Sequence, residues 1–82
     1  MAQILDSKME TYLYDSRLKM GETLKRIREK KGYSQEQLAE IMHISRTTIS
    51  KIENGKFAIS IDYLVKFGLH LNFDIKFIDK MI

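Results

Sequence analysis

Apolar residues recur along residues 17–31 at the spacing of one face of an α-helix. The positions i, i+4 and i+7 of this face are Met20, Leu24 and Ile27. This spacing follows the helical period of about 3.6 residues. The pair Asp15-Ser16 precedes the run as a candidate N-terminal cap, and Gly32 follows it as a candidate C-terminal cap. The pattern predicts a helix that starts near residue 16 and ends near residue 31.

A second pattern occurs three times: an apolar residue, a serine, and another apolar residue four positions after the serine. The three units are Tyr33-Ser34 with Leu38, Ile44-Ser45 with Ile49, and Ile59-Ser60 with Leu64. Such a serine caps the free N–H groups of a first helical turn, while the apolar pair packs across it as a hydrophobic staple. With Gly55 as a further stop, the units predict helices at about 35–42, 46–53 and 61–70. The turn between the first two of these is so short that they must cross steeply, as in a helix-turn-helix.

The last apolar segment, residues 71–78, alternates apolar with mostly polar residues at the period of a β-strand. One face of this strand would carry Leu71, Phe73, Ile75 and Phe77. A lone strand after four helices needs a partner for its N–H and C=O groups. The candidates are the same strand of a second subunit, residues 3–5 of the same chain, and a different protein. We favour the first, because Asp74 and Lys76 would pair across a two-fold axis, and we then expect deletion of residues 71–82 to give a monomer.

Composition limits the remaining possibilities. The chain has 82 residues, 44% of them hydrophobic and 30% charged, which is typical of one globular domain. It contains no cysteine, so disulfides, thiol catalysis and thiolate zinc sites are excluded. His43 and His70 are too far apart to suggest a metal site, and no nucleophile stands beside a base. We therefore expect no metal, no cofactor and no enzymatic activity. No apolar run reaches the roughly 20 residues that cross a membrane, so a cytoplasmic protein, in the bacterial cytoplasm or nucleoid, is the default.

Basic residues are unevenly distributed although the formal net charge is only +3. Residues 17–31 carry seven basic and two acidic residues, and residues 45–57 carry three basic and one acidic. Such runs can be solvated faces or phosphate-facing surfaces. At about 100° per residue, the helix at 46–53 would turn Ile49 and Ile52 toward the core. Its outward arc would hold Arg46, Thr47, Ser50, Lys51 and Asn54. An ordinary amphipathic surface helix has a similar arc, but this one offers donors, acceptors and positive charge suited to base edges.

These features together resemble the Cro/C1-type (XRE family) helix-turn-helix domain, from Met20 to about Leu69. The motifs are Gly-x-Ser-Gln-x-x-Leu-Ala at Gly32–Ala39, Ile-Ser-x-x-x-Ile-Ser at Ile44–Ser50, and Ile-Glu-Asn-Gly at Ile52–Gly55. The resemblance implies a mostly α fold, a lambda-repressor-like bundle of four to five helices. Many members end in a fifth helix, which a C-terminal β-strand pairing across a dimer would replace here.

The resemblance also assigns roles to individual residues. The positions that read base edges in the major groove are occupied by Arg46, Thr47, Ser50 and Lys51. The positions that bind phosphate are occupied by Gln35, Asn54 and Lys56. Arg28 and Glu53 match an ion pair between the first helix and the end of the third. His43 stands where the family often has glycine, so it must accept a left-handed backbone or shift the turn; a metal-binding or pH-sensing His43 is the alternative.

A Cro/C1 core followed by a dimerising strand is similar to HipB-like antitoxins of type II toxin–antitoxin modules. This resemblance implies a homodimeric, sequence-specific repressor on a palindromic double-stranded DNA operator, which also binds a cognate toxin. The alternative is a stand-alone phage or plasmid-type Cro/C1 regulator. The expected division is residues 1–16 as an N-terminal extension, 17–70 as the helix-turn-helix domain, and 71–82 as the dimerisation strand and tail. The extension has one apolar helical face, expected to pack on the domain rather than on a partner: Ile4, Leu5, Met9, Tyr12 and Leu13.

Overall fold

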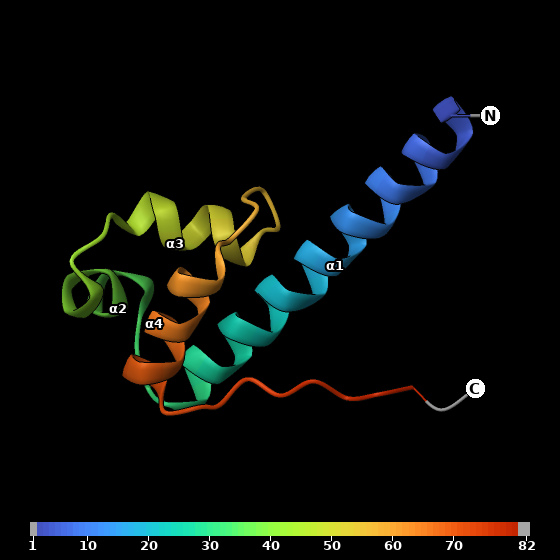
Figure 1. The fold of residues 1–82 in the computed structure, drawn as a ribbon. Helices are drawn as coiled ribbons and strands as arrows, with labels where there is room; N and C mark the ends of the chain where they lie inside the picture. Colours follow the sequence, from blue (N-terminus) through green and yellow to red (C-terminus); the bar gives the residue numbers. More distant parts are fainter. Residues whose placement is uncertain (1, 81–82) are drawn as a thin grey trace.

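Four helices make up the part of the chain that the computed structural model describes, which is residues 2–80, with side chains from residue 7 onward (Figure 1). They are α1 (Ala2–Lys30), α2 (Gln35–Met42), α3 (Arg46–Glu53) and α4 (Ile61–Leu71). The last three agree with the predicted helices to within one residue. They gather around the C-terminal half of α1, whereas its N-terminal half projects beyond them (Figure 1).

The first helix is much longer than predicted. It begins at Ala2 rather than near residue 16, because neither glycine nor proline interrupts the chain before Gly21 and most residues there are good helix formers. Asp15 and Ser16 therefore lie inside the helix instead of capping it. Although α1 has 29 residues, no helix within residues 2–80 is long and apolar enough to cross a bilayer.

The apolar face expected at the start of α1 does not pack on the domain. Met9, Tyr12 and Leu13 are 58%, 66% and 46% exposed, and the side chains of Ile4 and Leu5 lie outside the described residues. The expectation of core packing is thus wrong for the three described members. The core lies beside the other half of α1, so within the described residues Met9, Tyr12 and Leu13 remain largely uncovered.

The three serine caps are confirmed. The side chains of Ser34, Ser45 and Ser60 accept hydrogen bonds from the backbone N–H groups of Gln37, Thr48 and Tyr63, respectively. The Gln37 side chain also accepts from the Ser34 N–H at 2.8 Å, which completes the predicted capping box. These local contacts explain why the predicted starts of α2, α3 and α4 were accurate.

All four helices end on a residue with left-handed backbone. These residues are Gly32 (φ 87°), His43 (φ 56°), Gly55 (φ 72°) and Asn72 (φ 60°). In each case the N–H of the following residue donates to a carbonyl five residues back, at 2.8–3.1 Å, as in a Schellman motif. Of the two possibilities for the α2–α3 turn, His43 adopts the left-handed backbone.

The predicted C-terminal strand is absent from residues 2–80. Its first residue, Leu71, is the last residue of α4 and is only 1% exposed. Asn72 then reverses the chain, so that Phe73 packs back onto the core. Beyond it Ile75 is partly exposed and Phe77 is 96% exposed. The four apolar residues of the supposed strand face therefore do not share a face. The alternative partner segment at residues 3–5 belongs to α1, so it forms no strand either.

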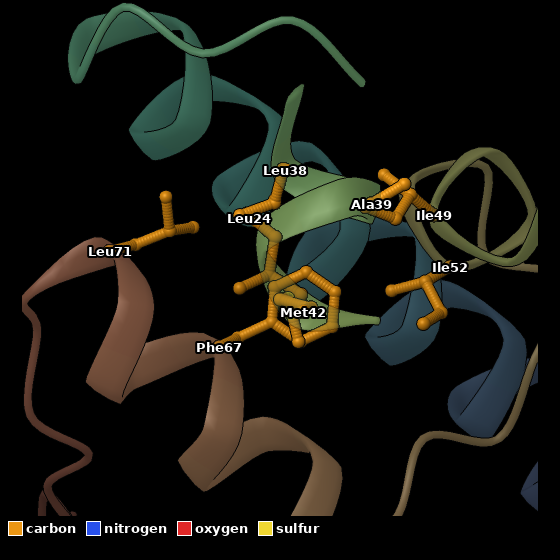
Figure 2. Close-up of a cluster of buried hydrophobic side chains, with 8 residues drawn as sticks. All are labelled: Leu24, Leu38, Ala39, Met42, Ile49, Ile52, Phe67 and Leu71. Carbon is orange, nitrogen blue, oxygen red and sulfur yellow. The ribbon is translucent and has the colours of Figure 1, made fainter. Parts of the chain in front are cut away.

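The hydrophobic core takes side chains from all four helices (Figure 2). Its buried members are Leu24, Leu38, Ala39, Met42, Ile49, Ile52, Phe67 and Leu71. Ile49 and Ile52 belong to α3, and their burial presses this helix against α1 and α2. The opposite face of α3 is left toward solvent.

Gly21 is the point at which α1 meets the end of α3. A Cβ atom at this position would lie 2.5 Å from the carbonyl oxygens of both Ile52 and Glu53. These neighbours are backbone atoms, so they cannot rotate away as a flexible side chain could. On the other side of the same contact, a Cβ at Gly55 would lie 2.9 Å from Cδ2 of Leu18. The absence of side chains at Gly21 and Gly55 thus allows α1 to support the end of α3 directly.

Gly21→Ala is expected to destabilise the domain by about 1–3 kcal/mol, because the new methyl group overpacks this contact. The intrinsic preference of helices for alanine would by itself give a gain of up to about 1 kcal/mol, so the sign of the change is diagnostic. Urea unfolding followed by circular dichroism measures it. Thr23→Ala, at an exposed position of α1, is the control and should change stability by less than about 0.5 kcal/mol. A more stable Gly21→Ala variant would contradict the close contact.

Candidate nucleic-acid interface

Helix α3 presents a polar face to solvent. Ile49 and Ile52, at 0% and 4% exposure, fix its inner side. Among the residues predicted for the outward arc, four are exposed and Ser50 is half-buried; the exposed four are Arg46, Thr47, Lys51 and Asn54. The Asn54 side-chain amide donates to the Ser50 hydroxyl at 3.4 Å. The arc therefore combines two cations with hydroxyl and amide groups on one rigid helix.

A buried ion pair holds the end of this helix to α1. The Arg28 guanidinium donates from Nε to Glu53 Oε2 at 2.7 Å and from Nη2 to Oε1 at 3.0 Å. Both residues are only 5% exposed, and Arg28 Nη1 also donates to the carbonyl oxygen of Tyr33 at 2.7 Å. The hydrogen bond to Glu53 raises the pKa of Arg28 above its ordinary value, against the opposing effect of burial. The Arg28 guanidinium thus remains charged, and its two hydrogen bonds to Glu53 orient the C-terminal end of α3.

Gln35 extends this pair to the protein surface. Its side-chain Nε2 donates to Glu53 Oε1 at 3.0 Å, and its Oε1 accepts from Arg46 Nη1 at 3.1 Å. Arg46 Nε also lies 3.7 Å from Glu36 Oε1. The sequence did not indicate this network, because its members are 11 and 18 residues apart and no local spacing joins them. Gln35 therefore positions Arg46 while keeping one amide N–H for a further acceptor.

The loop after α3 adds a second cationic region. Lys56 is exposed, and Lys51 Nζ lies 5.4 Å from the centre of the Phe57 ring. This cation–π contact draws Lys51 toward the loop. Phe57 was not among the predicted site residues, since an isolated aromatic residue in a loop has no characteristic spacing. The structure therefore brings Lys51, Asn54 and Lys56 to one end of α3, and Arg46 lies at the other.

Within the described residues, no three side chains of the metal-binding types form a cluster. His43 is exposed in the α2–α3 turn, and His70 is half-buried on α4. His43 ends α2 as a residue with left-handed backbone.

Two short helices that cross at a tight turn, with the second helix exposing a polar cationic face, define a helix-turn-helix protein. The family model described as Helix-turn-helix matches residues 24–78. The chain belongs to this family, and it carries a Cro/C1-type helix-turn-helix DNA-binding domain. The family is one of transcriptional regulators rather than enzymes.

Several known proteins are similar to this chain. An SPbeta prophage-derived uncharacterized HTH-type transcriptional regulator of Bacillus subtilis, YonR, is 36% identical over 69 residues, covering 67% of this chain and 63% of that protein. The competence pilus inhibition repressor of Acinetobacter baylyi is 36% identical over 50 residues, covering 57% of this chain and 46% of that protein. A helix-turn-helix protein of Pyrococcus furiosus is 41% identical over 46 residues, but these are only 15% of its length. The chain thus spans less than two thirds of these relatives.

A solved structure also matches the fold. The crystal structure of the restriction-modification controller protein C.AhdI from Aeromonas hydrophila superposes with a TM-score of 0.70 at 30% sequence identity. The match covers 74% of this chain and 88% of that one. The four-helix arrangement therefore resembles that of C.AhdI.

Proposed function

We propose that the chain is a sequence-specific repressor of transcription that binds a palindromic double-stranded DNA operator as a homodimer. The observation that carries this proposal is the exposed face of α3. It bears two cations and several hydrogen-bonding groups, and the core and the Arg28–Glu53 pair hold it rigidly. A rigid helix of this kind fits the major groove, whose base edges offer distinct patterns of donors and acceptors.

The base-reading residues in this proposal are Arg46, Thr47, Ser50 and Lys51. Arg46 supplies a planar fork of donors that matches O6 and N7 of guanine. Its contact with Gln35 supports this role, because the link to buried Glu53 restricts where the guanidinium lies. On binding DNA, Arg46 would exchange its long contact with exposed Glu36 for the base.

Phosphate binding is assigned to Gln35, Asn54 and Lys56. Gln35 is the first residue of α2, so the free N–H groups of that helix lie beside it and favour an anion. Asn54 and Lys56 follow the end of α3, at the other end of the polar face. Two phosphate contacts on either side of the recognition helix would fix its depth and register in the groove.

The role as a repressor draws support from the relatives. One is named as a repressor and another as a controller protein. The similarity to a prophage-derived regulator favours the stand-alone phage-type regulator among the two roles suggested by the sequence. The antitoxin role stays a prediction with less support, since the terminal strand that suggested it does not form within residues 2–80. Co-purification of the chain from the native host with a toxin encoded by a neighbouring gene would support the antitoxin role.

Arg46→Ala tests the proposed base reading. We expect operator affinity to fall by about 1–3 kcal/mol, with relaxed preference at one base pair, because a bidentate contact to guanine is lost. Selection from a random duplex library first defines the operator, and titration by fluorescence anisotropy then measures the affinity. Lys56→Ala should instead weaken binding to all sequences and reduce the salt slope by about one unit.

Arg26→Ala is the matched control for net charge, since Arg26 is an exposed arginine on α1 away from the polar face of α3. It should leave the sequence preference unchanged. Unaltered affinity and preference in Arg46→Ala would refute the base-reading assignment. Failure of the wild-type chain to prefer any duplex sequence would refute the proposed function itself.

A further inference from the structure

Phe57 is a large aromatic residue in the loop between α3 and α4 (Figure 1), and it lies outside the hydrophobic core cluster. Its side chain is 40% exposed. The ammonium nitrogen of Lys51 lies 5.4 Å from the centre of its ring. A cation within about 6 Å of a ring centre is attracted to the ring face. Since the lysine side chain is a flexible four-carbon stem, this contact sets the direction of the Lys51 ammonium group.

Lys51 is located at the margin of the face that would read bases. It lies in the last turn of α3, whereas Arg46 and Thr47 lie in the first turn. In helix-turn-helix proteins the N-terminal residues of the recognition helix contact base edges. At about 100° per residue, Lys51 is also roughly 140° away from Arg46, at the far edge of the outward arc. Its position along and around α3 therefore favours the DNA backbone over the base edges.

The surroundings of the Phe57 ring suit a phosphate group. Lys56 is exposed in the same loop. Within residues 7–80, neither Lys51 nor Lys56 takes part in an ion pair. The backbone N–H groups of Phe57 and Ala58 donate to no protein acceptor in the described part of the chain. Two positive charges and two N–H donors are thus available at this end of α3, and phosphate oxygens accept from such groups.

The chemistry of the two cations of α3 differs in the same sense. The guanidinium of Arg46 is a planar fork that suits a bidentate base contact, whereas the ammonium of Lys51 is a compact charge that suits phosphate. Base reading by Lys51 was assigned from the resemblance alone. The motifs that carry the resemblance end at Gly55, so they contain no counterpart of Phe57. The contact with this ring is therefore information that only the structure provides.

We propose that Lys51 binds a DNA phosphate beside Lys56 instead of a base edge, and that Phe57 is the positioning residue that holds it there. The inference rests on the proposed function and refines it. The base-reading residues that remain are Arg46, Thr47 and Ser50. The phosphate-binding group at the end of α3 gains Lys51 as a second cation, and this end of the recognition helix is held between two lysines and the backbone of one strand.

Salt dependence distinguishes the two roles of Lys51. A cation that neutralises one phosphate contributes about one unit to the slope of log affinity against log salt concentration, and it does so on every sequence. A base contact instead changes the preference at one base pair. The measurement is titration of the full chain by fluorescence anisotropy at salt concentrations from about 50 to 200 mM. The probes are the operator selected from a random duplex library and an unrelated duplex of the same length.

Lys51→Ala should reduce the salt slope by about one unit on both duplexes and leave the selected sequence unchanged. Combined with Lys56→Ala, it should reduce the slope by about two units. Relaxed preference at one base pair with an unchanged salt slope would overturn the inference and return Lys51 to base reading.

Phe57→Leu tests the positioning role, because leucine keeps an apolar side chain but has no ring. It should weaken binding to both duplexes by about two- to fivefold. Phe57→Trp should keep the affinity of the wild-type chain, since tryptophan offers the best ring face for a cation. In a Lys51→Ala chain, Phe57→Leu should cause no further loss. An undiminished loss in that chain would show that the ring acts on DNA without Lys51, which would overturn the positioning role. Thermal unfolding checks that each variant folds.

Lys66→Ala is the matched control for both charge and ring contact. The Lys66 ammonium lies 5.7 Å from the centre of the Tyr63 ring, and both residues belong to α4 rather than to the outward face of α3. This variant should leave the salt slope and the sequence preference unchanged. A wild-type chain that binds all duplexes equally would refute the proposed function, whereas an unchanged salt slope for Lys51→Ala on a selected operator would refute only the present inference.

Discussion

Arg28→Ala is expected to destabilise the domain by about 3–5 kcal/mol, because it leaves the Glu53 carboxylate buried without its two guanidinium donors. Among the described residues, only Gln35 would still donate a hydrogen bond to that carboxylate. At about 0.05–0.15 kcal/mol per residue, a domain of this size has only roughly 4–12 kcal/mol of stability. Urea unfolding at 25 °C, followed by circular dichroism, should show the variant close to the unfolding transition even without denaturant.

Two further variants distinguish the effect of breaking the buried ion pair from the effect of losing one positive charge. Arg26→Ala removes an exposed arginine from the same helix and should cost less than about 0.5 kcal/mol. The double change Arg28→Met with Glu53→Leu replaces both charges by apolar groups, and it should recover most of the lost stability. A cost below about 1 kcal/mol for Arg28→Ala would show that water or neighbouring groups compensate the carboxylate.

Truncation of the C-terminus should cost little stability when the cut lies after Phe73, and much more when it lies before Phe73. Removal of residues 75–82 should cost no more than about 1 kcal/mol, because Ile75, Phe77 and Ile78 are partly or almost fully exposed. Removal of residues 71–82 deletes buried Leu71, the left-handed Asn72 and the packed Phe73. The loss of Leu71 alone is comparable to a large-to-small change in the core, about 2–5 kcal/mol. Thermal and urea unfolding of both truncated chains measures the difference.

The structure changes the expected result of deleting residues 71–82. From the sequence, that deletion was expected to give a monomer that binds DNA far more weakly, through loss of a dimerising strand. The structure indicates a weakened or unfolded domain instead. The chain ending at residue 74 keeps Leu71, Asn72 and Phe73, so it should stay folded and keep the association state of the full chain on sedimentation. If it were a stable monomer while the full chain dimerised, the tail would again be the dimerising element.

Helix starts and the helix-turn-helix could be predicted because their causes are local. A serine cap and its N–H donor are three residues apart, and the staple residues are five apart, so each unit is complete in the sequence. The outward arc of α3 follows in the same way from the helical period, once Ile49 and Ile52 are assigned to the core. The same period placed the proposed base-reading residues on this arc, whereas their roles and the phosphate-binding residues came from the resemblance to the Cro/C1-type domain.

The errors at the two ends of the chain have a common cause. Alternation along residues 71–78 favours a strand only if the segment stays extended from its first residue. Leu71 completes α4 instead, and Asn72, like His43, stops a helix in the left-handed region. Asparagine is a known residue at such positions, so this stop was the missed indication. At the other end, Asp15 and Ser16 are capping residues by type, but an uninterrupted helix on both sides overrides that preference.

The sequence by itself determined where α2, α3 and α4 begin, how each of these helices is capped, and which side of α3 faces outward. Those features depend on residues within about one or two helical turns of one another. Only the tertiary structure decided that Gln35 joins the buried Arg28–Glu53 pair to Arg46, that Phe73 closes the core, and that residues 7–15 of α1 are exposed. These depend on contacts between distant segments, whose energies enter only when the helices pack around a shared core.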